Sequence, residues 1–136
     1  MQVKDVMGNV KVRDIMNKEL ITLNPSMSII DALNNQFVQM DYGTLPITSE
    51  DKLLGLITIS NIKRIPRSQW NTTTISKVMN KVSPNNCLGL DDEATVALAK
   101  MLRTQLDLLP VVDDHKLVGL VTQDILLGLM ESYEND

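Results

Sequence analysis

The feature that most constrains this chain is an internal repeat. The segment 45–58 aligns without a gap with 109–122, at an offset of 64 residues. Seven of the fourteen aligned positions are identical and three more exchange Ile or Leu for Val, where average composition gives about one identity. Upstream, Val12–Met16 matches Ile75–Met79 at an offset of 63. The chain therefore contains two copies of one structural unit.

Each repeat is expected to have the order strand, helix, strand, strand, helix. A short helical turn precedes it, at 12–16 and at 75–79. The predicted strands are 19–23, 44–48 and 52–57 in the first repeat, and 86–90, 108–112 and 117–121 in the second. Apolar residues at helical spacing mark the first helix of each repeat: Ile29, Ile30, Leu33, Phe37 and Met40, then Ala94, Ala97, Leu98, Met101 and Leu102. The second helix begins after Thr58 and after Thr122.

These patterns predict an α/β (α+β) fold in which two β-α-β-β-α repeats pack with pseudo-two-fold symmetry. A repeat of about 60 residues buries too little surface to be more than marginally stable alone, whereas two equivalent apolar faces can cover each other. Ser26 or Ser28, and Asp91 or Asp92, are suitable N-caps for the first helices. The predicted segments are an N-terminal extension at 1–11, repeats at 12–65 and 75–132, a linker at 66–74 and a tail at 133–136.

Composition narrows the class of protein. The single Cys among 136 residues excludes a disulfide framework and favours a reducing, cytoplasmic setting. A net charge of −4 argues against general nucleic-acid binding. No apolar run approaches the ~20 residues needed to cross a bilayer, so we expect no membrane insertion by this chain. The start shows no apolar signal region.

The repeated motif resembles a known family. A Leu-Pro strand, then Gly, two hydrophobic residues, Thr and a helix, occurring twice, resembles a tandem pair of cystathionine-β-synthase (CBS) domains. Tyr42–Pro46, Arg64–Trp70 and Thr72–Met79 are similar to the CBS pair attached to site-2-type membrane zinc metalloproteases. This chain has no His-Glu-x-x-His motif of such a protease.

The resemblance implies a regulatory, non-catalytic module with no required cofactor. It implies a ligand such as AMP, ADP, ATP or S-adenosylmethionine, bound in the cleft between the two repeats. It also implies a homodimer and control of an attached or partner protein, for which a membrane metalloprotease domain is a candidate. The family's nucleotide motif is Gly-hydrophobic-x-Thr/Ser-x-x-Asp. The first repeat has Gly55, Thr58 and Asn61, with Asn in place of Asp, and the second has Gly119, Thr122 and Asp124, with Asp one residue early.

These residue types suit a nucleotide. A strand that runs into a helix presents backbone N–H groups to a phosphate, and a glycine lets the backbone approach a ligand. Thr58 and Thr122 can cap their helices or offer a hydroxyl to phosphate. Asn61 can accept from one ribose hydroxyl and donate to the other, whereas Asp124 keeps a charge but lies about 100° around the helix. The predicted walls of the adenine slot are Thr22 with its neighbours in 21–23, Leu45, Pro46, Leu109 and Pro110.

Other interpretations stay open. Ser or Thr followed by an acidic or amide residue is also an ordinary helix cap, which leaves a ligand-free structural dimerisation module as the alternative. Lys63, Arg64 and Arg67 can bind phosphate or form a solvated helix end, and Lys100 and Arg103 are expected on the wet face of their helix. Cys87 and His115 carry no catalytic signature, so neither an enzyme nor a metal site is predicted.

Overall fold

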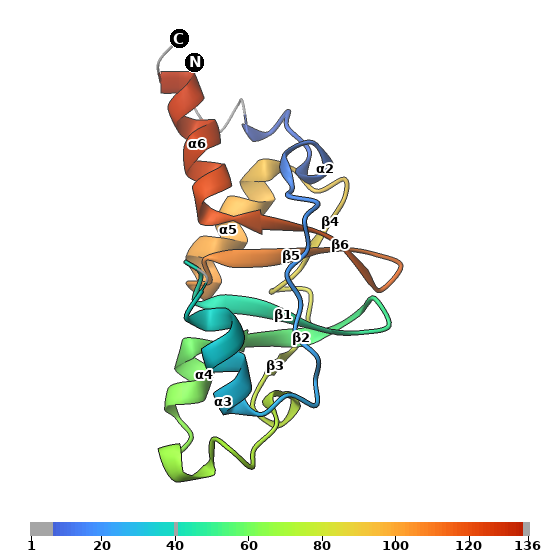
Figure 1. The fold of residues 1–136 in the computed structure, drawn as a ribbon. Helices are drawn as coiled ribbons and strands as arrows, with labels where there is room; N and C mark the ends of the chain where they lie inside the picture. Colours follow the sequence, from blue (N-terminus) through green and yellow to red (C-terminus); the bar gives the residue numbers. More distant parts are fainter. Residues whose placement is uncertain (1–6, 40, 135–136) are drawn as a thin grey trace. The chain divides into compact units, whose positions relative to one another are not determined.

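The computed structural model describes residues 7–39 and 41–134, which divide into two compact units (Figure 1). Unit 1 combines the chain up to Leu20 with the chain from Ser83 onward, and unit 2 is Ile21–Val82. Met40, which was predicted on an apolar helix face, lies outside the described residues, as do residues 1–6 of the predicted extension and 135–136 of the predicted tail.

Unit 2 is built on a β-hairpin that carries helices at both ends. Strand β1 pairs antiparallel with β2, and Leu23 adds a parallel bridge to Ile47 of β1. Among the described residues of this unit, nine buried apolar side chains form the core, including Ile29, Phe37 and Leu45. Its elements are α3 (Ile29–Ala32), η1 (Leu33–Phe37), β1 (Thr44–Ser49), β2 (Lys52–Thr58), α4 (Ile59–Lys63), η2 (Arg67–Gln69), η3 (Ile75–Lys77) and β3 (Asn80–Lys81).

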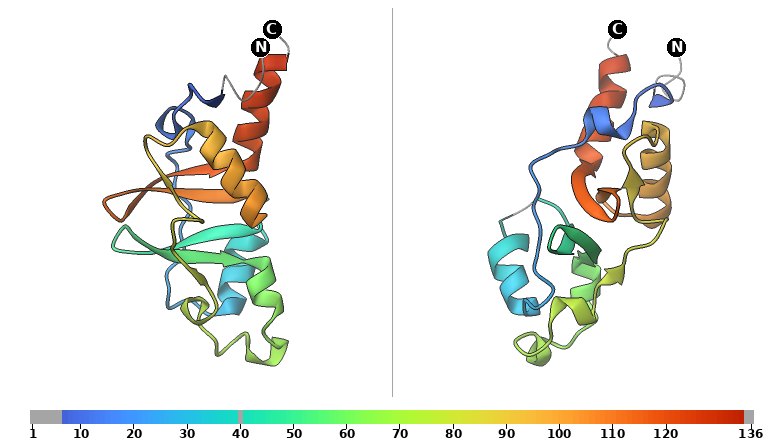
Figure 2. Two further views of the ribbon diagram at one scale, coloured as in Figure 1. Left: turned by 180° about the vertical axis from the view of Figure 1, so that it is seen from behind. Right: turned by 90° about the vertical axis from the view of Figure 1, so that its right-hand side faces the viewer.

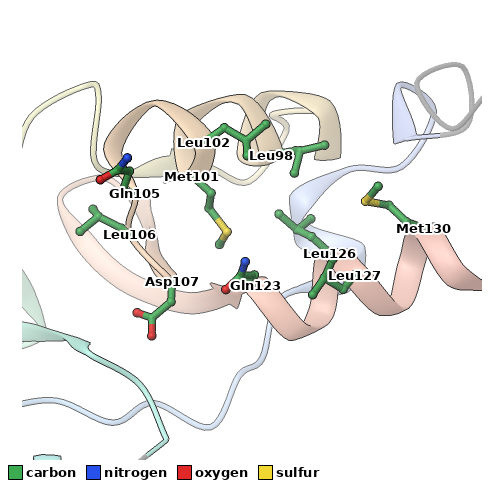
Figure 3. Close-up of a pocket in the computed structure, with 10 residues that line it drawn as sticks. All are labelled: Leu98, Met101, Leu102, Gln105, Leu106, Asp107, Gln123, Leu126, Leu127 and Met130. Carbon is green, nitrogen blue, oxygen red and sulfur yellow. The ribbon is translucent and has the colours of Figure 1, made fainter.

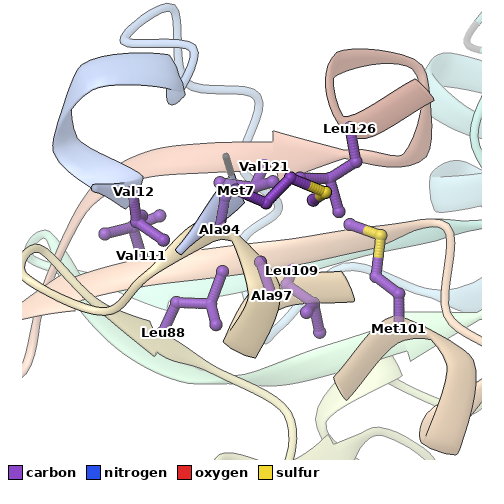
Figure 4. Close-up of a cluster of buried hydrophobic side chains, with 10 residues drawn as sticks. All are labelled: Met7, Val12, Leu88, Ala94, Ala97, Met101, Leu109, Val111, Val121 and Leu126. Carbon is purple, nitrogen blue, oxygen red and sulfur yellow. The ribbon is translucent and has the colours of Figure 1, made fainter. Parts of the chain in front are cut away.

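Unit 1 repeats this plan. Strand β5 pairs antiparallel with β6, and β4 lies parallel to β5. The core, shown in Figure 4, joins side chains of α5 and the hairpin to Met7 and Val12 from the start of the chain. The elements are α2 (Val12–Ile15), β4 (Leu88–Gly89), α5 (Ala94–Thr104), β5 (Leu108–Asp113), β6 (Lys116–Thr122) and α6 (Gln123–Glu134). The predicted mixed α+β fold is confirmed.

The two hairpins have the same backbone. Each turns through two residues with positive φ, at 50° and 68°: Glu50 and Asp51 in unit 2, Asp114 and His115 in unit 1. Positive φ at both positions is the geometry that matches the twist of two-residue hairpins. Each hairpin also shifts register at the matching place, between Ile47 and Thr48 and between Val111 and Val112. The sequence repeat is therefore a repeat of structure.

The compact units cut across the sequence repeats because the leading segments are exchanged. Asn17, at the start of the first repeat, pairs with Leu120 of unit 1 through bonds of 2.8 and 2.9 Å. Asn80, at the start of the second repeat, pairs with Leu56 of unit 2. Both views of Figure 2 show the blue N-terminal segment beside the yellow segment that leads into α5, where Val12 N–H donates to Asp92 O at 2.8 Å. Each hairpin thus gains one further pairing segment from the other repeat.

The first helix of the first repeat contains one extra residue. Ile29 and Phe37 are eight positions apart, while the equivalent buried residues Ala94 and Met101 are seven apart. The structure absorbs the extra residue as a π turn, η1, in which Val38 N–H donates to Leu33 O at 3.0 Å. A π turn arises when one residue is inserted into an α-helix. Both helices consequently keep their apolar residues on the buried face.

Two expectations for the second repeat are wrong. Helix α5 starts at Ala94 with Glu93 as N-cap, so neither Asp91 nor Asp92 caps it. The Asp92 carboxylate instead accepts from Gly89 N–H at 2.8 Å and closes the preceding turn. Lys100 is not a solvated side chain: its ammonium donates to Pro84 O at 2.7 Å and to Cys87 O at 2.9 Å. It fixes the loop before β4 to α5. In the first repeat, Ser28 rather than Ser26 is the cap, accepting from Asp31 N–H.

Candidate functional site

The strand-to-helix turn of unit 2 is closed by its own side chains. The Thr58 hydroxyl accepts from Asn61 N–H at 3.0 Å, and Asn61 Oδ1 accepts from Thr58 N–H at 3.0 Å and from Thr58 Oγ1 at 2.8 Å. This reciprocal arrangement is a capping box. The Asn61 amide nitrogen lies 3.4 Å from Asn80 Oδ1, and Asn61 is only 6% exposed. Asn61 is therefore committed to holding α4 and β3 together.

The equivalent turn of unit 1 is looser and carries a charge. The Thr122 hydroxyl accepts from Ile125 N–H at 3.4 Å, a long bond. Asp124, in the first turn of α6, is exposed to solvent. A carboxylate there benefits from the positive end of the helix dipole and can accept two hydrogen bonds from a diol. The two repeats thus differ in the first turn of their second helices, where one has the buried Asn61 and the other the exposed Asp124.

The backbone amides at these turns are partly engaged. Ile59 N–H donates to Gly43 O at 3.0 Å, and Gln123 N–H donates to Asp107 O at 2.9 Å. The third amide of each helix is taken by the capping threonine. The first and third amides of each helix are therefore engaged, and the prediction that these helix starts bind a phosphate stays a prediction.

Gly55 and Gly119 make room for neighbouring chain segments. A Cβ on Gly55 would lie 2.4 Å from the backbone oxygen of Asn80 and 2.9 Å from Met79 Sδ. A Cβ on Gly119 would lie 2.3 Å from Met16 Sδ. The methionines predicted at matched positions, Met16 and Met79, therefore occupy the space above the glycines. Close approach of the exchanged segments explains the glycine at both positions.

The predicted walls divide into core and surface. Leu45 and Leu109 are 0% exposed and belong to the hydrophobic cores, and Pro46 and Pro110 are buried beside them. Thr22 is exposed and directly precedes Leu23, whose N–H donates to Pro46 O at 2.9 Å. Unit 2 therefore brings Thr22 close to Pro46, with a polar side chain at the surface and the apolar residues beneath.

Cys87 and His115 form no reactive pair in the described structure. Burial raises the pKa of the Cys87 thiol, although Lys100 nearby opposes the shift, and the thiol donates to Ser83 O at 3.2 Å. A half-buried thiol with a raised pKa is a poor nucleophile. His115 lies exposed in its hairpin turn. Across residues 7–39 and 41–134, no cluster of three His, Cys, Asp or Glu side chains could hold a metal ion.

The sequence interpretation missed a groove between α5 and α6 of unit 1, shown in Figure 3. It has a volume of about 560 Å³, and apolar side chains from the two helices form most of its lining. Two of the lining leucines are unusually exposed, Leu102 at 71% and Leu127 at 47%. The sequence does contain one indication of this groove. Apolar residues cover a wider face of both helices than packing against a single hydrophobic core requires.

Comparison with known proteins decides the family. A sequence model described as the CBS domain matches residues 12–68 and 74–132. The chain belongs to the CBS domain family. The predicted tandem CBS pair is thereby confirmed. A CBS domain pair solved in complex with 5′-methylthioadenosine and S-adenosyl-L-methionine is 28% identical, with a TM-score of 0.74 over 91% of this chain and 98% of that chain.

In two relatives of this CBS pair, the matched region is part of a larger enzyme. An inosine-5′-monophosphate dehydrogenase of Methanocaldococcus jannaschii is 32% identical over 92% of this chain and 25% of its own length. A zinc metalloprotease of the same organism is 28% identical over 98% of this chain and 36% of its own length. The CBS pair therefore spans only a minor part of either relative. The second match supports the predicted similarity to metalloprotease-attached modules.

Within residues 7–39 and 41–134, every helix is too short or too polar to span a membrane.

Removal of the two capping hydroxyls should have unequal effects. Thr58→Ala removes the two hydroxyl bonds of a buried capping box and leaves the bond from the backbone N–H of residue 58, so we expect it to lower the free energy of unfolding by about 1–2 kcal/mol. Thr122→Ala removes one long bond and should cost about 0.5 kcal/mol. Urea titration followed by circular dichroism measures both values. Equal losses of unfolding free energy would show that the capping box at Thr58 does not stabilise its turn more than the single bond at Thr122 stabilises the other.

Proposed function

We propose that this CBS pair is a regulatory module that binds an adenine nucleotide or another adenosyl compound and controls an attached or partner protein. The observation that carries the proposal is the similarity to a CBS pair solved with 5′-methylthioadenosine and S-adenosyl-L-methionine, which extends over nearly the whole of both chains. AMP, ADP and ATP are the other candidates. The module itself has no catalytic role in this proposal.

Of the two strand-to-helix turns, the second is the better site for the ribose. Asp124 is charged and exposed to solvent, whereas Asn61 is neutral, 6% exposed and hydrogen-bonded to Thr58 and Asn80. A ligand at the first turn would have to break these bonds, and breaking buried bonds without replacement costs about 1–3 kcal/mol. Thr122, Gly119, Leu109 and Pro110 complete the proposed second site. Thr22, Leu45, Pro46, Gly55, Thr58 and Asn61 form the weaker first site.

Matched substitutions at the two turns test this assignment. Asp124→Asn keeps size and exposure but removes the charge, and we expect about tenfold weaker binding of the preferred adenosyl ligand, equivalent to one charge-assisted hydrogen bond. Asn61→Ala should leave the affinity of this ligand within about twofold. Isothermal titration calorimetry with AMP, ADP, ATP and S-adenosylmethionine gives the affinities. Loss of binding in Asn61→Ala alone would move the site to the first repeat.

The calorimetric titration also tests the second candidate function, which is a ligand-free dimerisation module. The capping box of Thr58 and Asn61 favours this function for the first repeat. A chain that binds none of the adenosyl compounds, yet forms a dimer in sedimentation, is such a scaffold.

The proposed assembly is a homodimer, and the proposed target of control is a domain joined to the module or bound by it. A membrane metalloprotease domain is one candidate, on the basis of the 28% identical metalloprotease relative. A coupling free energy of about 1–3 kcal/mol between ligand and target is enough for a useful switch. Adding the adenosyl ligand should therefore change the activity of a full-length protein that contains this module by about fivefold or more.

A further inference from the structure

The basic residues of this chain are concentrated in one stretch of sequence. From position 52 to position 90 there are six Lys or Arg residues and no Asp or Glu, although the whole chain has a net charge of −4. Three of the six, Lys63, Arg64 and Arg67, lie close together at the end of α4 and the start of η2 in unit 2. All three are exposed to solvent. This basic cluster is therefore a surface feature of unit 2 alone.

The fold does not require positive charge at this place. Helix α6 is the equivalent of α4 in the other repeat, and it carries Asp124, Glu131 and Glu134 without one Lys or Arg. A cation near the end of a helix is favoured by the helix dipole, but α6 has no basic residue in its last turn. The basic cluster is thus a property of the first repeat, and helix stability alone does not explain it.

The chain that carries the cluster is anchored to the rest of unit 2. Figure 1 draws it in light green, beyond the end of α4. Trp70 Nε1–H donates to Ile65 O at 2.8 Å, and Trp70 O accepts from Ile30 N–H of α3 at 3.1 Å. The Arg67 guanidinium lies over the Trp70 ring, 5.5 Å from its centroid. Arg67 is therefore presented by an ordered turn.

Neighbouring carboxylates do not neutralise the cluster. Within residues 7–39 and 41–134, none of its three side chains forms an ion pair. The acidic residue that adjoins it is the exposed Asp31, which follows Ile30 in α3, and Ile30 is bonded to Trp70. The remaining acidic residues of unit 2 lie before β1 and in the hairpin turn. Three exposed positive charges beside one negative charge attract a surface of negative charge.

The surroundings of Trp70 favour a lipid bilayer over a nucleic acid as that surface. Proteins that bind single-stranded nucleic acids combine basic groups with aromatic rings on which the bases stack. The Trp70 ring lies beneath Arg67, its N–H is bonded, and the residue is half-buried. Lipid phosphates need no aromatic ring for stacking. Basic side chains and tryptophan are both typical of protein surfaces at the edge of a bilayer.

We infer that the basic cluster of unit 2 is a docking surface for the anionic headgroups of a lipid bilayer. Lys63, Arg64 and Arg67 contact the headgroup phosphates, and an arginine can bind one phosphate through two parallel N–H bonds. Each basic side chain close to an anionic bilayer strengthens binding about fivefold, so three give weak and reversible docking. The inference involves none of the residues proposed for the adenosyl ligand.

Cosedimentation of the full chain with vesicles tests this inference without any nucleotide. Vesicles of equal parts phosphatidylcholine and phosphatidylglycerol should bind the chain at least about tenfold more tightly than vesicles of phosphatidylcholine alone, at low salt. The difference should disappear in about 0.5 M salt, where the Debye length is about 4 Å. Arg64→Glu should weaken binding to the anionic vesicles at least about fivefold.

Two further variants serve as controls, and circular dichroism verifies that every variant is folded. Lys52→Glu is the matched reversal of an exposed charge at the start of β2, outside the cluster, and should change vesicle binding by less than about twofold. Asp31→Asn removes the adjoining negative charge and should strengthen binding.

Three results would overturn the inference. The first is a wild-type chain that stays in the supernatant at millimolar anionic lipid or binds both kinds of vesicle equally. The second is tighter binding of a single-stranded or double-stranded oligonucleotide than of anionic vesicles at equal phosphate concentration, which would identify a nucleic acid as the partner. The third is release from the vesicles by millimolar glycerol phosphate, which would identify a site for a free phosphate.

Discussion

Gly55→Ala should destabilise this protein by about 3 kcal/mol or more, while Gly119→Ala should cost about 1–2 kcal/mol. The two glycines occupy equivalent positions, but different atoms lie above them. The new methyl group of Gly55→Ala meets the backbone oxygen of Asn80 at 2.4 Å, so β3 itself must move. The methyl group of Gly119→Ala meets the side chain of Met16, which can change rotamer.

Guanidinium titration of both variants measures this difference. The control is a double-mutant cycle of Gly119→Ala and Met16→Ala. The loss of unfolding free energy caused by Gly119→Ala should be smaller by at least about 1 kcal/mol in the Met16→Ala background. No substitution of Met79 should rescue Gly55→Ala to the same extent, because the obstacle there is backbone. Equal costs at the two glycines would mean that the exchanged segments do not pack as closely as described.

This exchange is the part of the fold that the sequence could not supply. The repeat and the alternating strands predicted both hairpins to within one or two residues, because each hairpin is encoded by local pattern and turn. The positions of Val12–Met16 and Ile75–Met79 depend on long-range pairing. The two segments are similar to each other in sequence. Local sequence therefore does not indicate which hairpin each segment will join. The structure gives each to the other repeat's hairpin.

The sequence predicted only part of the candidate site, because some of its side-chain contacts also depend on long-range neighbours. The motif located Thr58 and Thr122 at helix starts, and both do cap their helices. What the motif could not show is that Asn61 turns back onto Thr58 and reaches Asn80, since Asn80 lies nineteen positions away. Likewise, the contacts from Lys100 to Pro84 and Cys87 join a helix to a distant loop. Side-chain commitments of this kind depend on tertiary neighbours.

Deleting one residue from the first helix of each repeat should have very different consequences. Removing Asn35, an exposed residue of the π turn, should leave the free energy of unfolding within about 1 kcal/mol of the original. The shortened helix would have the spacing of α5, so Ile29 and Phe37 would stay on the buried face. The extra residue contributes no buried side chain.

Removing Ala99, an exposed residue of α5, is the matched deletion. It rotates the rest of that helix by about 100°, which carries Met101 away from the core and Lys100 away from its two carbonyls. The expected loss is about 3–5 kcal/mol, the range for emptying a buried site of this size. Thermal and urea denaturation compare the two chains. Similar losses in both would contradict the assignment of η1 as a one-residue insertion.

The central claim is that this CBS pair binds an adenosyl ligand, and native mass spectrometry of the freshly purified chain tests it most directly. We expect a species whose added mass is that of AMP, ADP, ATP, S-adenosylmethionine or 5′-methylthioadenosine, either co-purified or formed on addition. We also expect that a guanosine nucleotide does not replace it. A chain that stays at its bare mass with every adenosyl compound at millimolar concentration would contradict the account.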